Sequence, residues 1–203
     1  MRDAKVSPHQ VMSHTDQGEY SRTIFGFWVY LLTDFMMFAA LFAVYVVLRK
    51  NTLNGPGPKE LFDLRSALVQ TLVLLFGTFF VGMAGVYAHR NKRRKTLLYF
   101  GLTFILNSLF LWLMVSDLRR LIEMGQTWKN SGFLSAYFTL VATFGVHVAF
   151  ALLWTIVLLV PVLRGGIELF SLRRLVCLRM FWQFLNIIWI FIFSIVYLLR
   201  GIP

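Results

Sequence analysis

The sequence contains little cysteine and little histidine. Cys177 is the only cysteine, and the four histidines, His9, His14, His89 and His147, are scattered along 203 residues. A single cysteine cannot form a disulfide within the chain or ligate an iron–sulfur cluster. The separated histidines do not supply the ligands of a bis-histidine haem or of a histidine-rich copper site. We therefore expect the chain to hold no metal and no redox centre of its own.

Charged residues are also scarce, at 14% of the chain, whereas hydrophobic residues make up 58% and the mean hydropathy is +0.70. Soluble domains carry about 25% charged residues. The apolar residues form five long stretches, at residues 24–48, 67–88, 96–116, 133–162 and 180–199. Each is long enough for a spanning helix of about 20 residues and much longer than a barrel strand of about 10. The predicted fold is all-α, an integral membrane bundle of five transmembrane helices at 24–203 after a polar tail at 1–23.

Acidic residues are fewer than basic ones, with 9 Asp and Glu against 20 Lys and Arg, for a net charge of +11. The basic residues lie in short segments between apolar stretches, so they form topology signals and no continuous face for nucleic acid. Twelve lie on the side of the amino-terminal tail and eight on the other side. The densest group is Arg90, Lys92, Arg93, Arg94 and Lys95. The positive-inside rule therefore predicts a cytoplasmic amino terminus and an external carboxyl terminus.

Asp34 is the clearest ionisable residue inside an apolar stretch. It lies ten residues into the first stretch, about 15 Å along a helix and near the middle of a hydrocarbon core about 30 Å thick. Ionisable groups at this depth are costly and are therefore functional candidates. Two interpretations stay open, a carboxyl that hydrogen-bonds between helices and a group that handles protons.

His147 is the only histidine inside an apolar stretch, and Thr143 and Thr139 precede it at spacings of four residues. This spacing places the three side chains on one helix face. A lone histidine in such a position favours an interhelical hydrogen bond over a metal ligand.

Two further helix faces carry small or polar residues. In the second stretch, helical projection places four small residues within an arc of about 60°: Thr71, Thr78, Gly82 and Gly85. This strip of small residues would let another helix approach closely, and Gln70 lies beside it. In the last stretch, helical projection groups four polar residues within about 80°: Gln183, Asn186, Ser194 and Tyr197. We interpret this second face as hydrogen bonding to neighbouring helices and prefer that to an ion path.

Four segments carry a further signal, "IFGFWVYLLTDFMMFAALFAVYVVL", "GPGPKELFDL", "SGFLSAYFTLVATFGVHV" and "FWQFLNIIWIFIFSIVYLL". In this order and at this spacing they resemble subunit III of the haem-copper oxidase superfamily, closest to the bacterial quinol-oxidising, cytochrome bo type. The resemblance covers residues 24–199. Larger members of the family have seven helices, and this chain resembles the five-helix bacterial form.

The resemblance implies an accessory subunit with no catalytic and no cofactor-binding residues, packed beside subunit I, which carries haem and copper. It implies membership of a complex in the bacterial inner membrane that oxidises ubiquinol, reduces dioxygen to water and translocates protons. The external carboxyl terminus would then be periplasmic. The expected partners are the other oxidase subunits, chiefly subunit I, and membrane lipids including bound phospholipid. Neither a nucleic-acid partner nor action as a monomer is expected.

Several positions depart from the family pattern. Asp34 stands where the family has a buried carboxylate, and His147 matches the last histidine of an "HGxHV"-like motif. The motif's first histidine is replaced by Phe144, while Gln183 and Asn186 replace a histidine and an aspartate.

The remaining departures lie in the second and third stretches. Gln70 and Met114 stand where related quinol oxidase subunits have glutamate, and Asp117 replaces a further glutamate. Nearly all these changes remove an ionisable group, whereas the amides keep hydrogen-bonding capacity. The resemblance thus favours a scaffold over a proton-conducting subunit.

Two other functions stay open from the sequence. One is a subunit-III-like protein of another terminal oxidase or of a nitric oxide reductase. The other is an independent proton-coupled transporter built around Asp34 and His147, which the small number of polar residues along the apolar stretches disfavours. The electron donor, quinol or cytochrome c, is decided in other subunits and cannot be read from this chain.

Overall fold

The computed structural model describes residues 14–53, 57, 61–90, 92–165 and 169–199, so most of the predicted polar tail lies outside the described residues. The described residues contain no strand. The helices are α1 (His14–Leu48), α3 (Leu64–His89), α4 (Arg93–Glu123), α5 (Gly132–Gly165) and α6 (Leu169–Ile192), which continues as a π-helix, η1 (Phe193–Leu198). Within the described ranges, five helices are long and apolar enough to cross a membrane. The predicted all-α fold with five spans is confirmed.

Every helix extends past at least one end of its predicted apolar stretch. α1 begins at His14, inside the predicted tail, and α4 continues from the predicted end at residue 116 to Glu123. Helical hydrogen bonds satisfy the backbone as well in the interface as in hydrocarbon, while long polar side chains reach water. Hydropathy therefore marks the membrane-embedded part of a helix and underestimates its length.

Local signals set the ends of two helices. α3 follows Asp63, whose carboxylate accepts a hydrogen bond from the Arg65 N–H over 2.9 Å, an N-cap contact. α4 ends before Gly125, which has φ +77°. There the Gly125 N–H donates to the Ile122 C=O and the Gln126 N–H to the Leu121 C=O, both over 2.9 Å, as in a Schellman motif.

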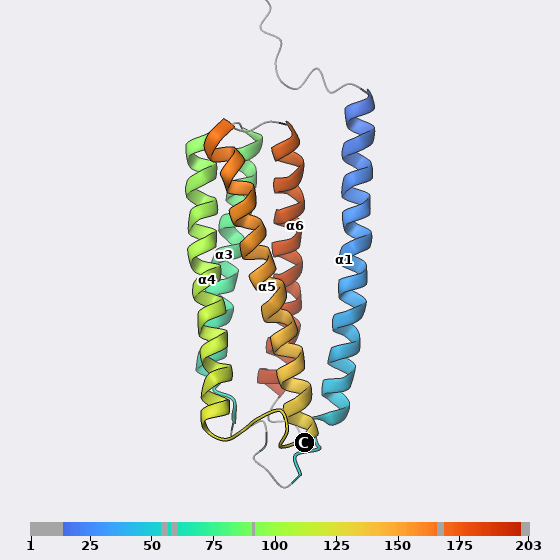
Figure 1. Cartoon of the computed structure of the whole chain (residues 1–203), viewed down its shortest axis with the longest axis vertical. Coiled ribbons are helices and arrows are strands. Elements are labelled where there is room, and N and C mark those ends of the chain that lie inside the picture. The colour runs from blue at the N-terminus through green and yellow to red at the C-terminus, as the bar shows by residue number, and fades with distance from the viewer. Residues whose placement is uncertain (1–13, 54–56, 58–60, 91, 166–168, 200–203) are drawn as a thin grey trace, which may run out of the picture.

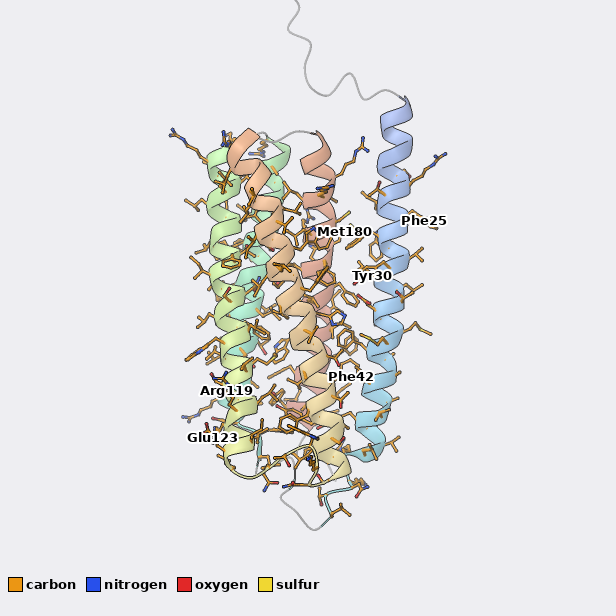
Figure 2. The ribbon with its side chains drawn as sticks, viewed as in Figure 1. Phe25, Tyr30, Phe42, Arg119, Glu123 and Met180 are labelled. Atoms are coloured by element: carbon orange, nitrogen blue, oxygen red, sulfur yellow. The ribbon has the colours of Figure 1, made fainter. Side chains whose placement is uncertain are left out.

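The four helices α3, α4, α5 and α6 form a bundle, and α1 lies at its edge against α5 and α6 (Figure 1). Figure 2 shows Tyr30 and Phe42 directed from α1 toward the bundle and Phe25 directed away from it. Hydrogen bonds fix the end of α1: Arg49 Nη2 donates to the Leu199 C=O over 3.3 Å. Just beyond, the Phe133 N–H donates to the Asn51 C=O over 3.2 Å. This end of α1 is thus tied to both α5 and the last helix.

Aromatic rings form the centre of the bundle. The Phe110 and Trp189 rings meet edge to face with centroids 4.8 Å apart, and Phe144 lies 5.4 Å from Trp189. Phe38 brings α1 into the same cluster, 6.4 Å from Phe144. All four side chains are buried. Such pairs contribute about 0.5–1.5 kcal/mol each beyond the burial of their area, so Phe144 serves here as a packing residue.

α3 and α4 approach each other closely at Gly77. A Cβ at this position would overlap the amide of Asn107. Asn107 is fully buried, and neither its Oδ1 nor its Nδ2 has a hydrogen-bond partner within the described residues. Thr103 Oγ1 on α4 donates to the Gly77 C=O over 3.4 Å. The absence of a side chain at Gly77 therefore allows the contact between these helices.

We predict that Gly77→Ala lowers the free energy of unfolding by about 1–3 kcal/mol, because the added methyl overpacks a buried interface. Gly82→Ala on the same helix is the matched control, since a Cβ there meets nothing within 4 Å. Thermal unfolding in detergent, followed by circular dichroism, compares the two. Equal melting temperatures would contradict the prediction.

Candidate functional site

Asp34 of α1 and His147 of α5 face each other, with Asp34 Oδ2 3.9 Å from His147 Nε2. His147 Nδ1 lies 2.8 Å from the Thr143 C=O. Because a carbonyl oxygen only accepts, Nδ1 carries a proton and donates it, and Nε2 faces the carboxyl. Thr143 thus contributes through its backbone. The sequence identified all three residues but not the pairing between helices.

Aromatic side chains surround this pair, and among them Tyr30 lies close to Asp34. The Phe38 ring lies 5.2 Å from the imidazole, and Asp34 Oδ2 is buried with no hydrogen-bond partner among the described residues. A separation of 3.9 Å is too long for a direct hydrogen bond. The pair can hold one proton between two helices or act as a polar contact that orients α1 against α5, the two interpretations that the sequence left open.

A second polar group, the Asp117 cluster, consists of Ser66, Gln70, Asp117, Tyr137 and Tyr197. Gln70 Nε2 and Ser66 Oγ both donate to Asp117 Oδ2, over 2.6 and 2.7 Å. The buried hydroxyls of Tyr137 and Tyr197 lie 3.1 Å apart. A cavity of about 20 Å³ between Asp117 and the tyrosines is large enough for one water molecule.

The Asp117 cluster joins predicted and unpredicted residues. Gln70 and Tyr197 were predicted as buried polar contacts, whereas Ser66 and Tyr137 were missed. Ser66 precedes Gln70 by four residues, a spacing that places both on one helix face, and this signal could have found it. Nothing comparable in the sequence pairs Tyr137 with Tyr197, since they lie 60 residues apart.

The last helix does not keep the predicted polar face along its whole length. It changes to the π form at Phe193, and the wider π turn shifts the angular position of every later residue. Tyr197 therefore points into the bundle, with its ring 5.4 Å from that of Phe62, whereas Gln183 is exposed on the surface of the chain. A regular α projection cannot reproduce this separation, and Gln183 does not make the expected buried contact with any described residue.

Gln183 and Asn186 line a groove of about 340 Å³ between α3 and α6, which we call the amide groove. The α3 side of the amide groove consists of Leu75, Thr78, Phe79, Gly82 and Met83. Asn186 Oδ1 is buried and has no hydrogen-bond partner among the described residues. The predicted strip of small residues faces α6 beyond the groove as well: Thr71 Oγ1 accepts a hydrogen bond from Trp189 Nε1 over 3.0 Å, and Gly85 lies against Arg179.

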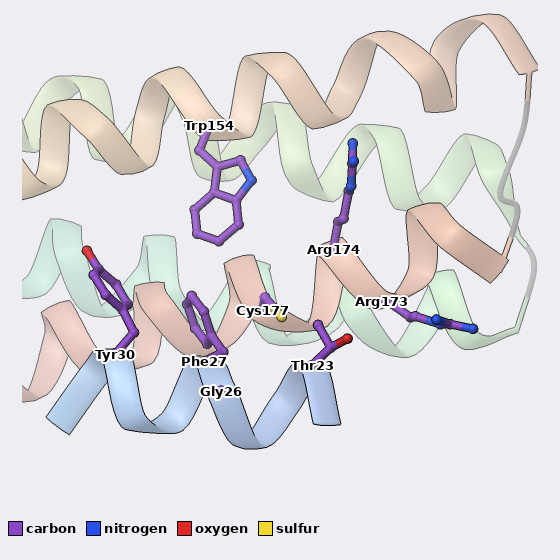
Figure 3. A pocket seen from close by; sticks show the side chains of 8 residues that line it. All are labelled: Thr23, Gly26, Phe27, Tyr30, Trp154, Arg173, Arg174 and Cys177. Carbon is purple, nitrogen blue, oxygen red and sulfur yellow. The ribbon is translucent and has the colours of Figure 1, made fainter. Parts of the chain in front are cut away.

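A separate cavity of about 430 Å³ lies between α1, α5 and α6 and was not predicted. Figure 3 shows Phe27 and Tyr30 rising from α1 toward Trp154 of α5. The centroids of the Phe27 and Trp154 rings are 5.8 Å apart. Arg173 and Arg174 of α6 line the end of the cavity nearest the start of that helix. The cavity thus combines aromatic walls with a basic end.

The predicted topology signal is exposed at the turn between α3 and α4. Arg90, Lys92, Arg93, Arg94 and Lys95 are all exposed. Lys95 Nζ lies 5.1 Å from the centre of the Tyr87 ring, and Arg93 donates a hydrogen bond to the Leu163 C=O of α5. Across the described ranges, no three His, Cys, Asp or Glu side chains come together as metal ligands would.

We predict that Asp117→Ala lowers the free energy of unfolding by about 1–3 kcal/mol, because Ser66 and Gln70 lose their shared acceptor in a buried place. Asp117→Asn, which keeps one acceptor oxygen, should lose less. Glu123→Ala, at an exposed position of the same helix, should change stability by less than about 0.5 kcal/mol. Unfolding in mixed micelles with increasing dodecyl sulfate measures all three, and an Asp117→Ala variant as stable as Glu123→Ala would refute the assignment.

Comparison with known proteins relates the chain to oxidase subunits over most of its length. It is 38% identical to cytochrome bo(3) ubiquinol oxidase subunit 3 of Pseudomonas aeruginosa over 96% of this chain and 94% of that protein. The protein of the same name from Buchnera aphidicola subsp. Baizongia pistaciae is also 38% identical, over 90% of this chain and 94% of its own length. Cytochrome c oxidase subunit 3 of Bacillus sp. (strain PS3) is 34% identical over 86% and 84%. No family model matches the chain.

These identities extend through all five spans, so they relate the whole membrane domain and not one motif. The resemblance found in the sequence is confirmed. With its five apolar helices, the chain is a multi-pass membrane protein, and it belongs to the family of oxidase subunit 3 that includes cytochrome bo(3) ubiquinol oxidase subunit 3.

Proposed function

We propose that this chain is a non-catalytic accessory subunit of a respiratory terminal oxidase, a ubiquinol oxidase of the cytochrome bo type. Its match to a subunit 3 of that oxidase over 96% of the chain carries the proposal. Its role is to support the assembly and stability of subunit I. Haem and copper belong to subunit I, where the complex oxidises ubiquinol, reduces dioxygen to water and translocates protons.

The polar contacts of the chain support a scaffold role, because they join its own helices. The Asp117 cluster connects α3, α4, α5 and η1, and Trp182 Nε1 of α6 donates to Thr155 Oγ1 of α5 over 3.3 Å. Hydrogen bonds between membrane helices contribute about 0.6–2 kcal/mol each. Together they would hold the helices in one arrangement against which a catalytic subunit can pack.

The same proposal includes an orientation in the bacterial inner membrane, with the amino terminus in the cytoplasm and the carboxyl terminus in the periplasm. The excess of Lys and Arg on the amino-terminal side supports it, twelve against eight. The exposed basic turn between α3 and α4 would then face the cytoplasm.

In this orientation the basic end of the cavity between α1, α5 and α6 faces the cytoplasmic side, and we assign the cavity to a bound phospholipid. Phe27, Tyr30 and Trp154 would contact an acyl chain, while Arg173 and Arg174 lie where a phosphate group would enter. Guanidinium groups bind phosphate oxygens in a bidentate way, and anionic lipids are concentrated in the cytoplasmic leaflet.

The function is tested by purifying the tagged chain in a mild detergent. The wild-type chain should copurify with haem-bearing subunits that oxidise ubiquinol. If the Asp34–His147 pair is a structural contact, Asp34→Leu should lower haem recovery about tenfold, and Asp34→Asn should lower it less because an amide can still hydrogen-bond. Turnover per haem should stay unchanged in both. A haem-free oligomer of the wild-type chain would refute the function, and normal assembly with lost proton pumping in both variants would favour proton handling.

The orientation is tested with single cysteines at two exposed positions, Lys92 and Lys129, in a Cys177→Ala background. A thiol reagent that cannot cross membranes should label Lys129→Cys in spheroplasts. It should label Lys92→Cys only after the membrane is made permeable. The reverse pattern would invert the topology.

A further inference from the structure

The amide groove presents hydrogen-bonding groups inside the predicted membrane-embedded part of the last helix. Gln183 and Asn186 lie three and six residues after the start of the apolar stretch 180–199, about 5–10 Å along the helix. Both positions fall within a hydrocarbon core about 30 Å thick. The acyl chains that surround a helix there offer no hydrogen-bonding group.

The described part of the chain does not satisfy these amides. Each primary amide offers two donor hydrogens and one acceptor oxygen. Gln183 is exposed and makes no hydrogen bond among the described residues, and Asn186 Oδ1 is buried without a partner. Leaving such groups unpaired in hydrocarbon costs a large fraction of the stability of a helix contact. A partner outside the chain would remove this cost.

The opposite wall of the amide groove includes small residues. Thr78 and Gly82 are spaced four residues apart on α3, which lets a helix backbone approach closely. A Cβ at Gly82 would meet nothing within 4 Å. The apolar side chains of Leu75 and Phe79, which are 40% and 61% exposed, extend the wall along α3. The groove thus combines a small-residue surface with two amides at the same level.

We propose that the amide groove receives a transmembrane helix of another oxidase subunit, which presents a hydroxyl or amide side chain to Gln183 and Asn186 beside Gly82. This inference rests on the proposed function. An acyl chain would fill the groove but has no hydrogen-bonding group, so it leaves both amides unsatisfied. A partner helix can hydrogen-bond to the exposed Gln183 amide and to the accessible part of Asn186, and it covers the exposed apolar wall. Because amides do not titrate, the contact itself would not depend on pH.

The test is a pair of glycine substitutions in the full complex. Gly82→Leu places a side chain in the groove, and its Cβ meets nothing within 4 Å, so the subunit itself should reach the membrane at wild-type amounts. Gly101→Leu on α4 is the matched control, because a Cβ there also meets nothing within 4 Å. Haem recovered per mole of tagged chain should fall about tenfold for Gly82→Leu and stay at the wild-type value for Gly101→Leu.

Wild-type haem recovery with Gly82→Leu, or equal losses in both variants, would overturn the proposal. The wild-type chain in the same experiment distinguishes failure of the groove proposal from failure of the proposed function. If the wild-type chain recovers haem, an unexpected result with Gly82→Leu contradicts only the groove proposal. If the wild-type chain recovers no haem, the proposed function itself is contradicted. A benzophenone amino acid at Phe79 identifies the occupant directly. It should crosslink to another oxidase subunit, and crosslinks only to lipid or to a second copy of this chain would overturn the assignment.

Discussion

The lack of water in the membrane is the constraint on which the rest of this structure depends. In hydrocarbon, every buried amide, hydroxyl or carboxyl must find its partner in protein, since solvent cannot supply one. The chain meets much of this requirement by placing polar side chains at helix contacts, although Asn107 and Asn186 keep buried amide atoms without a partner among the described residues. The Asp117 cluster, the Asp34–His147 pair and the Trp182–Thr155 hydrogen bond each join different helices. A small number of polar residues therefore specifies the arrangement of a mostly apolar bundle.

Close packing of apolar side chains is the second interaction that holds the helices together. Aromatic rings fill the centre of the bundle, and Gly77 and Gly145 let side chains of α4 lie against neighbouring helices: Asn107 reaches Gly77 of α3, and Met114 reaches Gly145 of α5. Met114 and Phe144 stand where the family resemblance places ionisable residues. Both are buried here. At these two positions, uncharged side chains pack in the apolar interior, as expected of residues with a structural role.

The sequence predicted the five spans because hydropathy reports directly on the hydrocarbon core. It also identified Asp34, His147, Gln70 and Asn186, since polar residues inside apolar stretches are conspicuous. It could not predict which of them pair, because pairing depends on how separate helices are arranged. Ser66 and Tyr137 were missed because hydroxyls near helix ends are common. Tyr197 is buried as predicted, but Gln183, which the α projection grouped with it, is exposed, because α periodicity does not describe a π-helix.

Because of the π segment, side chains in the two parts of the last helix face different surroundings. In its α part, Gln183 and Asn186 lie toward the membrane-facing groove, and in η1, Tyr197 lies inside the bundle. In a continuous α-helix these side chains would all lie on the same helix face and could not have different surroundings. The wider π turn changes the angular position of the residues after Phe193 relative to those before it. Residues on either side of Phe193 can therefore vary under separate demands, one from the surroundings of the groove and one from the interior of the bundle.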